Sequence, residues 1–399
     1  MKIDDREPNQ SRAEPGAHYV TPLLKDVADQ AATADTTSTI SAEVISAIKK
    51  NPVMTMTACE DLAGLNANLV DIGHELGALA PCCTSTAWIV WNHLILFHHF
   101  SGLFGPDHQD FLKSIVTNGH LITQGVGPGT AVTGTRKNGS VLVDGVTAFA
   151  TGCRYSDWTG VAFIENGKKD LQFTLVDTHN PKVRVDPTWD AMSVRASATD
   201  HVYVDNIDVP AEHIVTWPMK DRETYRDPNR KMIHQRYRDC WTALGSMLMG
   251  VMASKLAGTC LDEITRDSRD RVAVFGVKWA DRPLVQVNLG RARALVNAAA
   301  DTAYAALEET DDRIANRVNP TEEFYLRQML AGMQAILFCD EAMNLMQRVL
   351  GAHGLQRTSK FERRFRDFQA IPLHIIPHVD RVSEQSGKNA LGIETDNPY

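Results

Sequence analysis

The sequence of 399 residues lacks the glycine-rich signatures of nucleotide binding. It has no Gly-x-Gly-x-x-Gly after a strand pattern and no P-loop, the segments that hold dinucleotides and nucleoside triphosphates. The nearest segment, Gly-Val-Gly-Pro-Gly at 125–129, follows a helical pattern. We therefore expect no nicotinamide-binding Rossmann unit. If the protein uses reducing equivalents, we expect another protein to deliver them.

Paired cysteines, excess positive charge and long apolar runs are also missing. The seven cysteines form no Cys-x-x-Cys spacing, which favours reduced thiols and predicts neither a disulfide framework nor a metal site. The net charge of −8 argues against nucleic acid as a partner. No uninterrupted apolar run reaches the roughly 18–20 residues of a membrane span, and the polar N-terminus does not resemble a signal peptide. We expect a cytoplasmic protein with no membrane partner.

The hydrophobic pattern changes twice along the chain. Apolar residues recur at helical spacing from about residue 20 to 117, short β-branched runs follow between about 125 and 217, and long helical patterns return from about 234. Clustered strands that do not alternate with helices predict an antiparallel sheet or small barrel. We expect an α+β protein with an N-terminal helical domain at 18–122, a central β domain at 123–218 and a C-terminal helical bundle at 232–399.

Some elements carry sharper local signals. The segment from about Thr84 to Leu103 is apolar nearly all round, which predicts an interior helix. Ser41 is a plausible N-cap for a short helix. Asn138-Gly139 and Asn166-Gly167 each separate two β-branched runs, which predicts hairpins with two-residue turns.

Several ordered segments, spread from about residue 20 to 392, resemble one family. They are Cys83–Trp88, Phe149–Gly152 with Ser156–Trp158, Trp189–Arg195 with Val209-Pro210, Arg363–Asp367 with His374, and Leu391-Gly392. Together they resemble the acyl-CoA dehydrogenase superfamily, and within it the oxygenase components of two-component flavin-dependent monooxygenases.

This resemblance implies an acyl-CoA dehydrogenase-like fold and a specific chemistry. Reduced FMN or FAD would come from a separate NAD(P)H-dependent flavin reductase and react with O2 to a flavin hydroperoxide. The substrate expected is a small phenol- or indole-like aromatic, because the interior helix is rich in large aromatic side chains. The resemblance also implies a homotetramer.

One position separates the branches of the superfamily. Acyl-CoA dehydrogenases of the common kind carry a glutamate base where this chain has Ile375, and the monooxygenases carry a histidine where it has His374. A histidine near its free pKa of about 6.5 suits proton exchange with substrate or flavin. We therefore expect His374 to be catalytic.

The resemblance also implies roles for other residues. Thr151 would place its hydroxyl against the flavin ring and act in catalysis. The further cofactor contacts expected are Gln124, Gly125, Phe149, Gly152, Arg271 and Arg366. The substrate contacts expected are Trp88, His93, His120 and His374, with His93 also catalytic.

Alternatives remain open for several of these residues. His93 could be a core histidine bonded to the backbone. Arg271 could belong to a charged surface helix, and Arg366 could be a structural ion-pair partner of Asp367. The whole chain could instead be an N-hydroxylating monooxygenase of an amine or amino sugar, an acyl-CoA dehydrogenase with a relocated base, or a catalytically silent scaffold.

Overall fold

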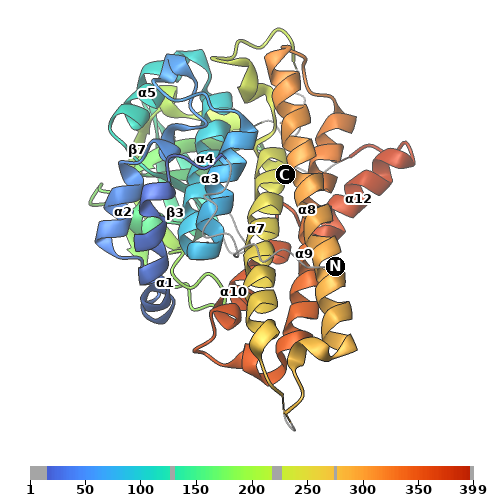
Figure 1. Ribbon diagram of the computed structural model, residues 1–399. Helices are drawn as coiled ribbons and strands as arrows, with labels where there is room; N and C mark the ends of the chain where they lie inside the picture. Colours follow the sequence, from blue (N-terminus) through green and yellow to red (C-terminus); the bar gives the residue numbers. More distant parts are fainter. Residues whose placement is uncertain (1–15, 126–130, 218–226, 274–275, 396–399) are drawn as a thin grey trace.

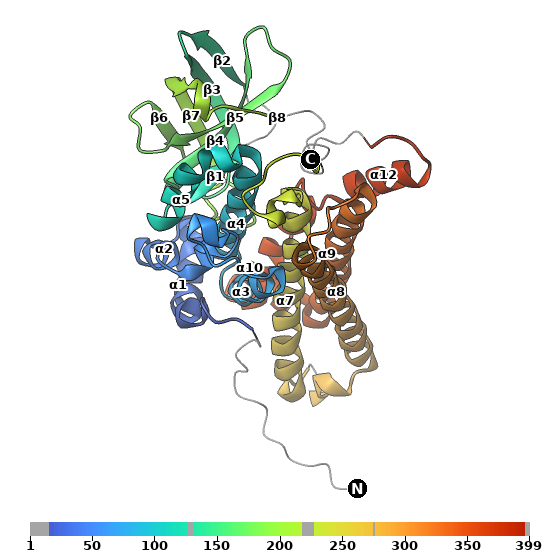
Figure 2. The same cartoon turned by 90° about the horizontal axis from the view of Figure 1, so that it is seen from above.

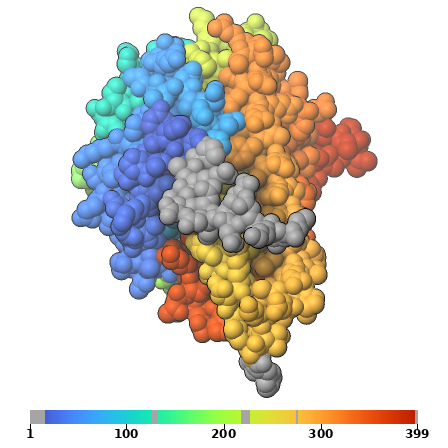
Figure 3. Space-filling view, viewed as in Figure 1, coloured from blue at the N-terminus to red at the C-terminus, as the bar shows by residue number. Residues whose placement is uncertain are grey.

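A computed structural model describes residues 16–125, 131–217, 227–273 and 276–395. The order of elements is helices, then a sheet, then helices, as the hydrophobic pattern predicts. Figure 1 shows the N-terminal helices and the sheet on one side and the C-terminal helices on the other. In the space-filling view, blue N-terminal atoms and yellow to orange C-terminal atoms lie side by side where grey atoms do not cover them (Figure 3).

The N-terminal region consists of short helices around one long one. Its helices are η1 (Thr21–Leu23), α1 (Leu24–Thr37), α2 (Ala42–Lys49), η2 (Pro52–Thr55), η3 (Glu60–Leu62), α3 (Leu69–Cys82), α4 (Thr84–Phe104), η4 (Pro106–His108) and α5 (Gln109–Thr117). The predicted N-cap of α2 is confirmed, because the Ser41 hydroxyl accepts the N–H of Val44 at 3.3 Å.

The central region is a single sheet. Its strands are β1 (Ile122–Gln124), β2 (Ala131–Lys137), β3 (Ser140–Ala150), β4 (Trp158–Glu165), β5 (Leu171–Asp177), β6 (Val183–Asp186), β7 (Asp200–Pro210) and β8 (Val215–Trp217), with η5 (Cys153–Tyr155) and η6 (Ala211–His213) between them. The strand order is β6-β7-β3-β2-β4-β5-β8, with β1 beside β4. Five of the strand pairs are antiparallel as expected, but the sheet is mixed, because β4 pairs in parallel with both β1 and β2.

The first predicted hairpin is confirmed. Asn138 and Gly139 join β2 to β3 with φ of 28° and 86°, the positive values that a two-residue primed turn requires. The second hairpin also joins antiparallel neighbours, β4 and β5. Its connection from Glu165 to Leu171 is longer than the two residues expected.

The C-terminal region is built on three long helices. Its elements are η7 (Gln235–Arg238), α7 (Trp241–Asp270), η9 (Trp279–Asp281), α8 (Pro283–Ala315), α9 (Glu322–Leu350), η10 (Gly351–Leu355), α10 (Lys360–Phe368), α11 (Ala370–Leu373) and α12 (Val379–Ala390). Helices α7, α8 and α9 pack lengthwise against one another, and α12 projects from the bundle (Figures 1 and 2).

Helix α4 lies where the three regions meet. All 21 of its residues are buried, which its sequence predicts because it is apolar on every side. It packs against α3, α7 and β1, and Figure 2 shows it between the sheet and the bundle. The core of the protein is therefore continuous across the regions through this helix.

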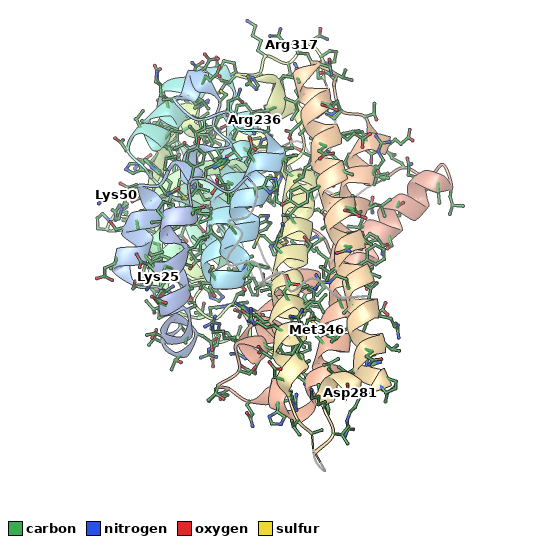
Figure 4. The ribbon with its side chains drawn as sticks, in the orientation of Figure 1. Lys25, Lys50, Arg236, Asp281, Arg317 and Met346 are labelled. Atoms are coloured by element: carbon green, nitrogen blue, oxygen red, sulfur yellow. The ribbon has the colours of Figure 1, made fainter. Side chains whose placement is uncertain are left out.

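A buried arginine ties the N-terminal region to the bundle. Arg236 in η7 is 3% exposed and donates to the Asn66 side chain at 2.8 Å and to the Ala67 carbonyl at 3.0 Å. Figure 4 shows it at the boundary between the N-terminal helices and the long helices. These hydrogen bonds replace the water that a buried guanidinium loses.

One described helix, α7, is long and apolar enough to cross a membrane. Its most apolar window is 83% buried inside the fold, which is how the core helix of a soluble protein behaves.

Two glycines in the bundle make opposite predictions. A Cβ at Gly332 in α9 would lie 2.3 Å from the Ser246 carbonyl oxygen of α7, whereas a Cβ at Gly290 in α8 meets nothing within 4 Å. We expect Gly332→Ala to destabilise the protein by about 1–3 kcal/mol through overpacking. We expect Gly290→Ala to stabilise it by about 0.5–1 kcal/mol. Urea unfolding of both variants tests this, and a neutral Gly332→Ala would contradict the close contact of α7 with α9.

Candidate functional site

Helix α4 has the bundle on one side and the sheet on another. The Trp91 indole donates to the Gly245 carbonyl of α7 at 3.1 Å, and the next residue but one, His93, accepts the N–H of Ile122 in β1 at 3.1 Å. Successive helical residues are rotated by about 100°. The side chain of Asn92, which lies between Trp91 and His93 in the sequence, therefore points toward the corner where the bundle meets the sheet.

Trp88, Asn92 and His99 share this face of α4, and we call them the junction stripe. The Trp88 ring lies 5.4 Å from the ring of His374, in the segment after α11. The His99 ring lies 4.9 Å from Trp241 at the start of α7 and 5.9 Å from Phe173 in β5. The junction stripe thus faces the region where sheet, bundle and C-terminal segment meet, which we call the junction.

His374 is held among aromatic rings. It meets Trp88 and Trp91 edge-on, with the Trp91 centroid at 5.1 Å and the rings at 90°. Its Nδ1 accepts the N–H of Ile376 at 3.2 Å, so the neutral ring carries its hydrogen on Nε2. Burial, aided by the positive charge of Arg381, lowers the pKa of His374 to about 3. The expectation of a pKa near 6.5 therefore fails, and at neutral pH His374 is an uncharged hydrogen-bond donor.

Thr151 and Gly152 follow a strained end of β3. Phe149 is 47% exposed with a φ of 57°, and the N–H of Thr151 donates back to its carbonyl at 3.1 Å. Positive φ at a non-glycine residue is a strain that often marks functional sites. A Cβ at Gly152 would lie 3.2 Å from Ile89 of α4. Thr151 therefore lies near Ile89 of α4. The residue before Ile89 is Trp88, which contacts His374.

A chain of buried hydroxyls ends at Thr151. Its Oγ1 lies 3.1 Å from Oγ1 of Thr199, which lies 2.7 Å from Oγ of Ser197. The backbone carbonyl of Thr151 accepts the Thr123 hydroxyl. Each hydroxyl can donate one hydrogen bond and accept others, so the chain can run in either direction. Thr151 can consequently present either its hydrogen or its oxygen to a ligand.

The end of β1 provides a second polar group. Gln124 is 7% exposed, and its Oε1 has no hydrogen-bond donor among the described residues. The neighbouring Gly125 lies so close to β3 that a Cβ there would be 2.5 Å from the Ala148 carbonyl oxygen. Of the segment 125–129 identified in the sequence, the last four residues lie outside the described residues.

Two of the predicted pocket histidines lie elsewhere. Both ring nitrogens of His93 are engaged, Nε2 with the Met54 carbonyl at 2.9 Å and Nδ1 with the N–H of Ile122, and burial lowers its pKa to about 4. His93 is therefore a core histidine bonded to the backbone, the alternative that the sequence left open. His120 accepts the indole N–H of Trp158 at 3.1 Å, and Trp158 packs edge-on against Phe111 of α5, so His120 is also engaged within the fold.

The structure does not use Arg366 as a cofactor ligand. Its five N–H groups are all engaged, by the carboxylates of Asp35 and Glu362 and by the Met192 carbonyl. Nor does it pair with Asp367, whose buried carboxylate accepts the N–H of Val194 at 2.8 Å. Arg366 is a structural clamp between α1, α10 and the loop before β7.

Asp367 has a supporting role that the sequence did not reveal. Burial raises its pKa to about 7. Through Val194, at a φ of 42°, it fixes the loop that carries Ser197 and Thr199 of the hydroxyl chain. The loop and α10 are 173 residues apart in sequence, so no local pattern could have predicted this contact.

Arg271 lies far from the junction within the chain. It follows the last residue of α7 and stacks over Trp279 with its guanidinium carbon 4.5 Å from the ring centre. Gly245, near the other end of α7, contacts Trp91, so Arg271 is roughly 40 Å away along the helix at 1.5 Å per residue. A role for Arg271 at a flavin would therefore require another subunit.

Three surface clefts of the described residues lie outside the junction. Their volumes are about 580, 420 and 400 Å³, and they are lined by other residues than Thr151, Asn92 and His374. Likewise, no three His, Cys, Asp or Glu side chains of the described residues are grouped as a metal site requires. The junction itself is lined by the packed side chains given above.

The polar groups at the junction fit a reduced flavin. The unpaired Gln124 oxygen and the Thr151 end of the hydroxyl chain suit the hydrogen-bonding edge of an isoalloxazine. The glycines at 125 and 152 allow the backbone to approach closely.

Comparison with known proteins supports the same fold. Residues 248–378 match the family described as acyl-CoA dehydrogenase, C-terminal domain. The chain is 24% identical over 356 residues to the oxygenase component of the FADH2-dependent resorcinol hydroxylase of a Rhizobium species, covering 84% of this chain and 82% of that protein. It is also 24% identical to the cyclohexane-1-carbonyl-CoA dehydrogenase of Geobacter metallireducens, covering 86% and 87% of the two chains.

A solved structure extends the likeness to the whole fold. The complex of TdsC from Paenibacillus sp. A11-2 with FMN and indole superposes with a TM-score of 0.83 at 17% identity, covering 98% of this chain and all of that one. The resemblance seen in the sequence is thus confirmed: the chain has the acyl-CoA dehydrogenase fold, and its relatives include flavin-dependent monooxygenases.

Two histidines with lowered pKa values, the buried His98 and the half-buried His374, predict a pH dependence of stability. Burial lowers the pKa of His98 and of His374 to about 3, whereas in the unfolded chain each is about 6.5. The unfolded chain therefore binds more protons below pH 6.5, so this stabilisation is complete above that pH and is lost as the pH falls toward 3. We expect the melting temperature to fall between pH 6.5 and 4.5, and to fall less steeply in His374→Gln.

Two comparisons separate the contribution of His374 to this pH dependence from the contributions of other titratable groups. Asp367, with its raised pKa of about 7, acts in the opposite direction in both proteins, so the difference between their curves isolates His374. The same change at exposed His353 should leave the curve unaltered. Parallel curves for wild type and His374→Gln would contradict the lowered pKa of His374.

Proposed function

We propose that this chain, which has the acyl-CoA dehydrogenase fold, is the oxygenase component of a two-component flavin-dependent monooxygenase that hydroxylates a small aromatic or heteroaromatic substrate. The observation that carries the proposal is the junction itself. The hydroxyl chain ends at Thr151, whose neighbour Gly152 lies beside Ile89 of α4. The neutral His374 contacts the rings of Trp88 and Trp91, which flank Ile89 on the same helix.

Reduced FMN or FAD bound at the junction would supply the electrons and the carbon that reacts with dioxygen. Thr151, Gln124 and the backbone at Gly125 and Gly152 are the groups that would hold it. When Thr151 donates to Thr199 and Thr199 to Ser197, the Thr151 oxygen is free to accept a ring N–H of the flavin. A hydrogen bond of this kind, in a site away from water, would keep that hydrogen on the flavin ring during the reaction.

The aromatic residues around His374 partly cover its ring and help to keep it uncharged. Trp88 and Trp91 cover the imidazole, which stays uncharged because of its lowered pKa. Its Nε2–H can donate to a substrate oxygen or to oxygen activated by the flavin. In a dry site this hydrogen bond is stronger than in water.

The partners follow from the same proposal. A reductase that uses NAD(P)H would deliver the reduced flavin, since the sequence carries no dinucleotide-binding motif of its own. In a homotetramer, Arg271 would reach the flavin phosphate of another subunit from the end of α7.

The Geobacter relative favours one alternative, an acyl-CoA dehydrogenase. That reaction needs a base, and the position beside His374 is held by Ile375, which is 52% exposed. His374 carries its hydrogen on Nε2 and resists protonation, which suits a donor better than a base. Tightly held oxidised FAD that an acyl-CoA bleaches would favour the dehydrogenase.

The first test is turnover. With chemically reduced FMN or FAD, oxygen and a panel of phenols and indoles, we expect oxygenated product. Purified protein that binds no reduced flavin and yields only free hydrogen peroxide would refute the proposed function.

The second test concerns Thr151. We expect Thr151→Val to release more hydrogen peroxide per product, by about tenfold if one good hydrogen bond is lost. Thr151→Ser should restore most of the coupling because it keeps the hydroxyl. Thr178→Val, at a hydroxyl that donates to the Ser156 carbonyl outside the junction, is the matched control. Equal coupling in Thr151→Val and wild type would remove Thr151 from the mechanism.

A further inference from the structure

We propose that Asn92 recognises the substrate by accepting a hydrogen bond from an N–H or O–H group on its aromatic ring. This inference rests on the proposed function and narrows its substrate class. The enzyme would act on indoles, phenols and similar donors, and would discriminate against isosteres that lack the donor.

The first observation is an unpaired atom. Asn92 is 9% exposed, and its Oδ1 has no hydrogen-bond donor among the described residues. A buried amide oxygen without a donor costs about 1–3 kcal/mol. An unpaired group of this kind needs an explanation, and a functional site is one.

The second observation is where this atom lies. Asn92 is the middle member of the junction stripe, one turn beyond Trp88 and two turns before His99. Those two neighbours contact His374 and the rings of Trp241 and Phe173. The amide is therefore an isolated polar group on an aromatic wall that faces the proposed flavin site.

The third observation is the contrast with other polar groups of α4. The Thr84 hydroxyl donates to the Ala80 carbonyl, and the rings of Trp91 and His98 bond to carbonyls of Gly245 and Asp239. Each of these side chains has a structural partner in a neighbouring element or turn. The oxygen of Asn92 has none among the described residues. The hydroxyls of Thr86 and Ser101 lack one there too, but at about 100° per residue they lie on other faces of α4 than the junction stripe.

The chemistry of the two junction groups is complementary. Asn92 offers an acceptor, and His374 offers a donor on Nε2. An N–H or O–H on a flat ring would satisfy Asn92 and restore the hydrogen bond that the free protein lacks. A ring with sulfur in place of N–H would bury the same area and leave the oxygen unpaired, so a site of this kind rejects it.

Indole and benzothiophene form a suitable pair, because they differ by N–H against S in rings of nearly equal shape. Their affinities would be measured by calorimetry under anaerobic conditions, with the protein saturated with reduced FMN. We expect indole to bind at least about tenfold more tightly to the wild type. In Asn92→Leu the preference should disappear, mainly through weaker binding of indole.

Stability provides a second readout. Replacing an unpaired polar group by an apolar one of similar size is neutral or stabilising. We therefore expect the melting temperature of Asn92→Leu to be unchanged or higher, and a clear fall would show that Asn92 has a structural role instead. Thr174→Val, which removes another buried hydroxyl without a partner, is the control and should keep the preference for indole.

The outcomes separate this inference from the proposed function. If reduced FMN binds and the wild type holds indole and benzothiophene equally, prefers benzothiophene or holds neither, the role of Asn92 is refuted while the oxygenase proposal stands. If reduced FMN does not bind, the oxygenase proposal fails, and the inference fails with it.

Discussion

The complete burial of α4 is the constraint on which the rest of the structure depends. A helix with no face toward water must be covered on every side, and here β1, α3 and α7 cover it. Adjacent residues of such a helix necessarily touch different regions of the protein. Trp88 contacts His374 of the C-terminal segment, and the next residue, Ile89, lies beside Gly152 just after β3, so adjacent residues of α4 reach the two segments that carry His374 and Thr151.

The burial of α4 also determines which chemistry is available at the junction. In a dry environment a polar group is either paired within the protein or left at a cost. His93 and His98 are paired with the backbone and serve the fold. Within the part of the chain that the structure describes, the side-chain oxygens of Asn92 and Gln124 have no hydrogen-bond partner, and His374 is uncharged. A ligand that forms hydrogen bonds with these groups would offset part of the free-energy cost of leaving them unpaired in the free protein.

The sequence predicted what depends on local pattern. The interior helix, the Ser41 cap and the Asn138-Gly139 turn each follow from a few neighbouring residues. It could not predict contacts between distant segments, such as the Thr151–Thr199 hydroxyl pair or the clamp of Arg366 on Asp35, 331 residues away. The pKa and tautomer of His374 were equally out of reach, because both depend on rings and a backbone N–H that folding brings to it.

A crystal structure of the protein prepared anaerobically with reduced FMN tests the central claim most directly. The account predicts an isoalloxazine ring between the sheet and the bundle, within hydrogen-bond distance of the Thr151 hydroxyl and open on one side toward Asn92 and His374. A flavin bound elsewhere on the chain, or a junction still filled by its own side chains at saturating flavin, would contradict it.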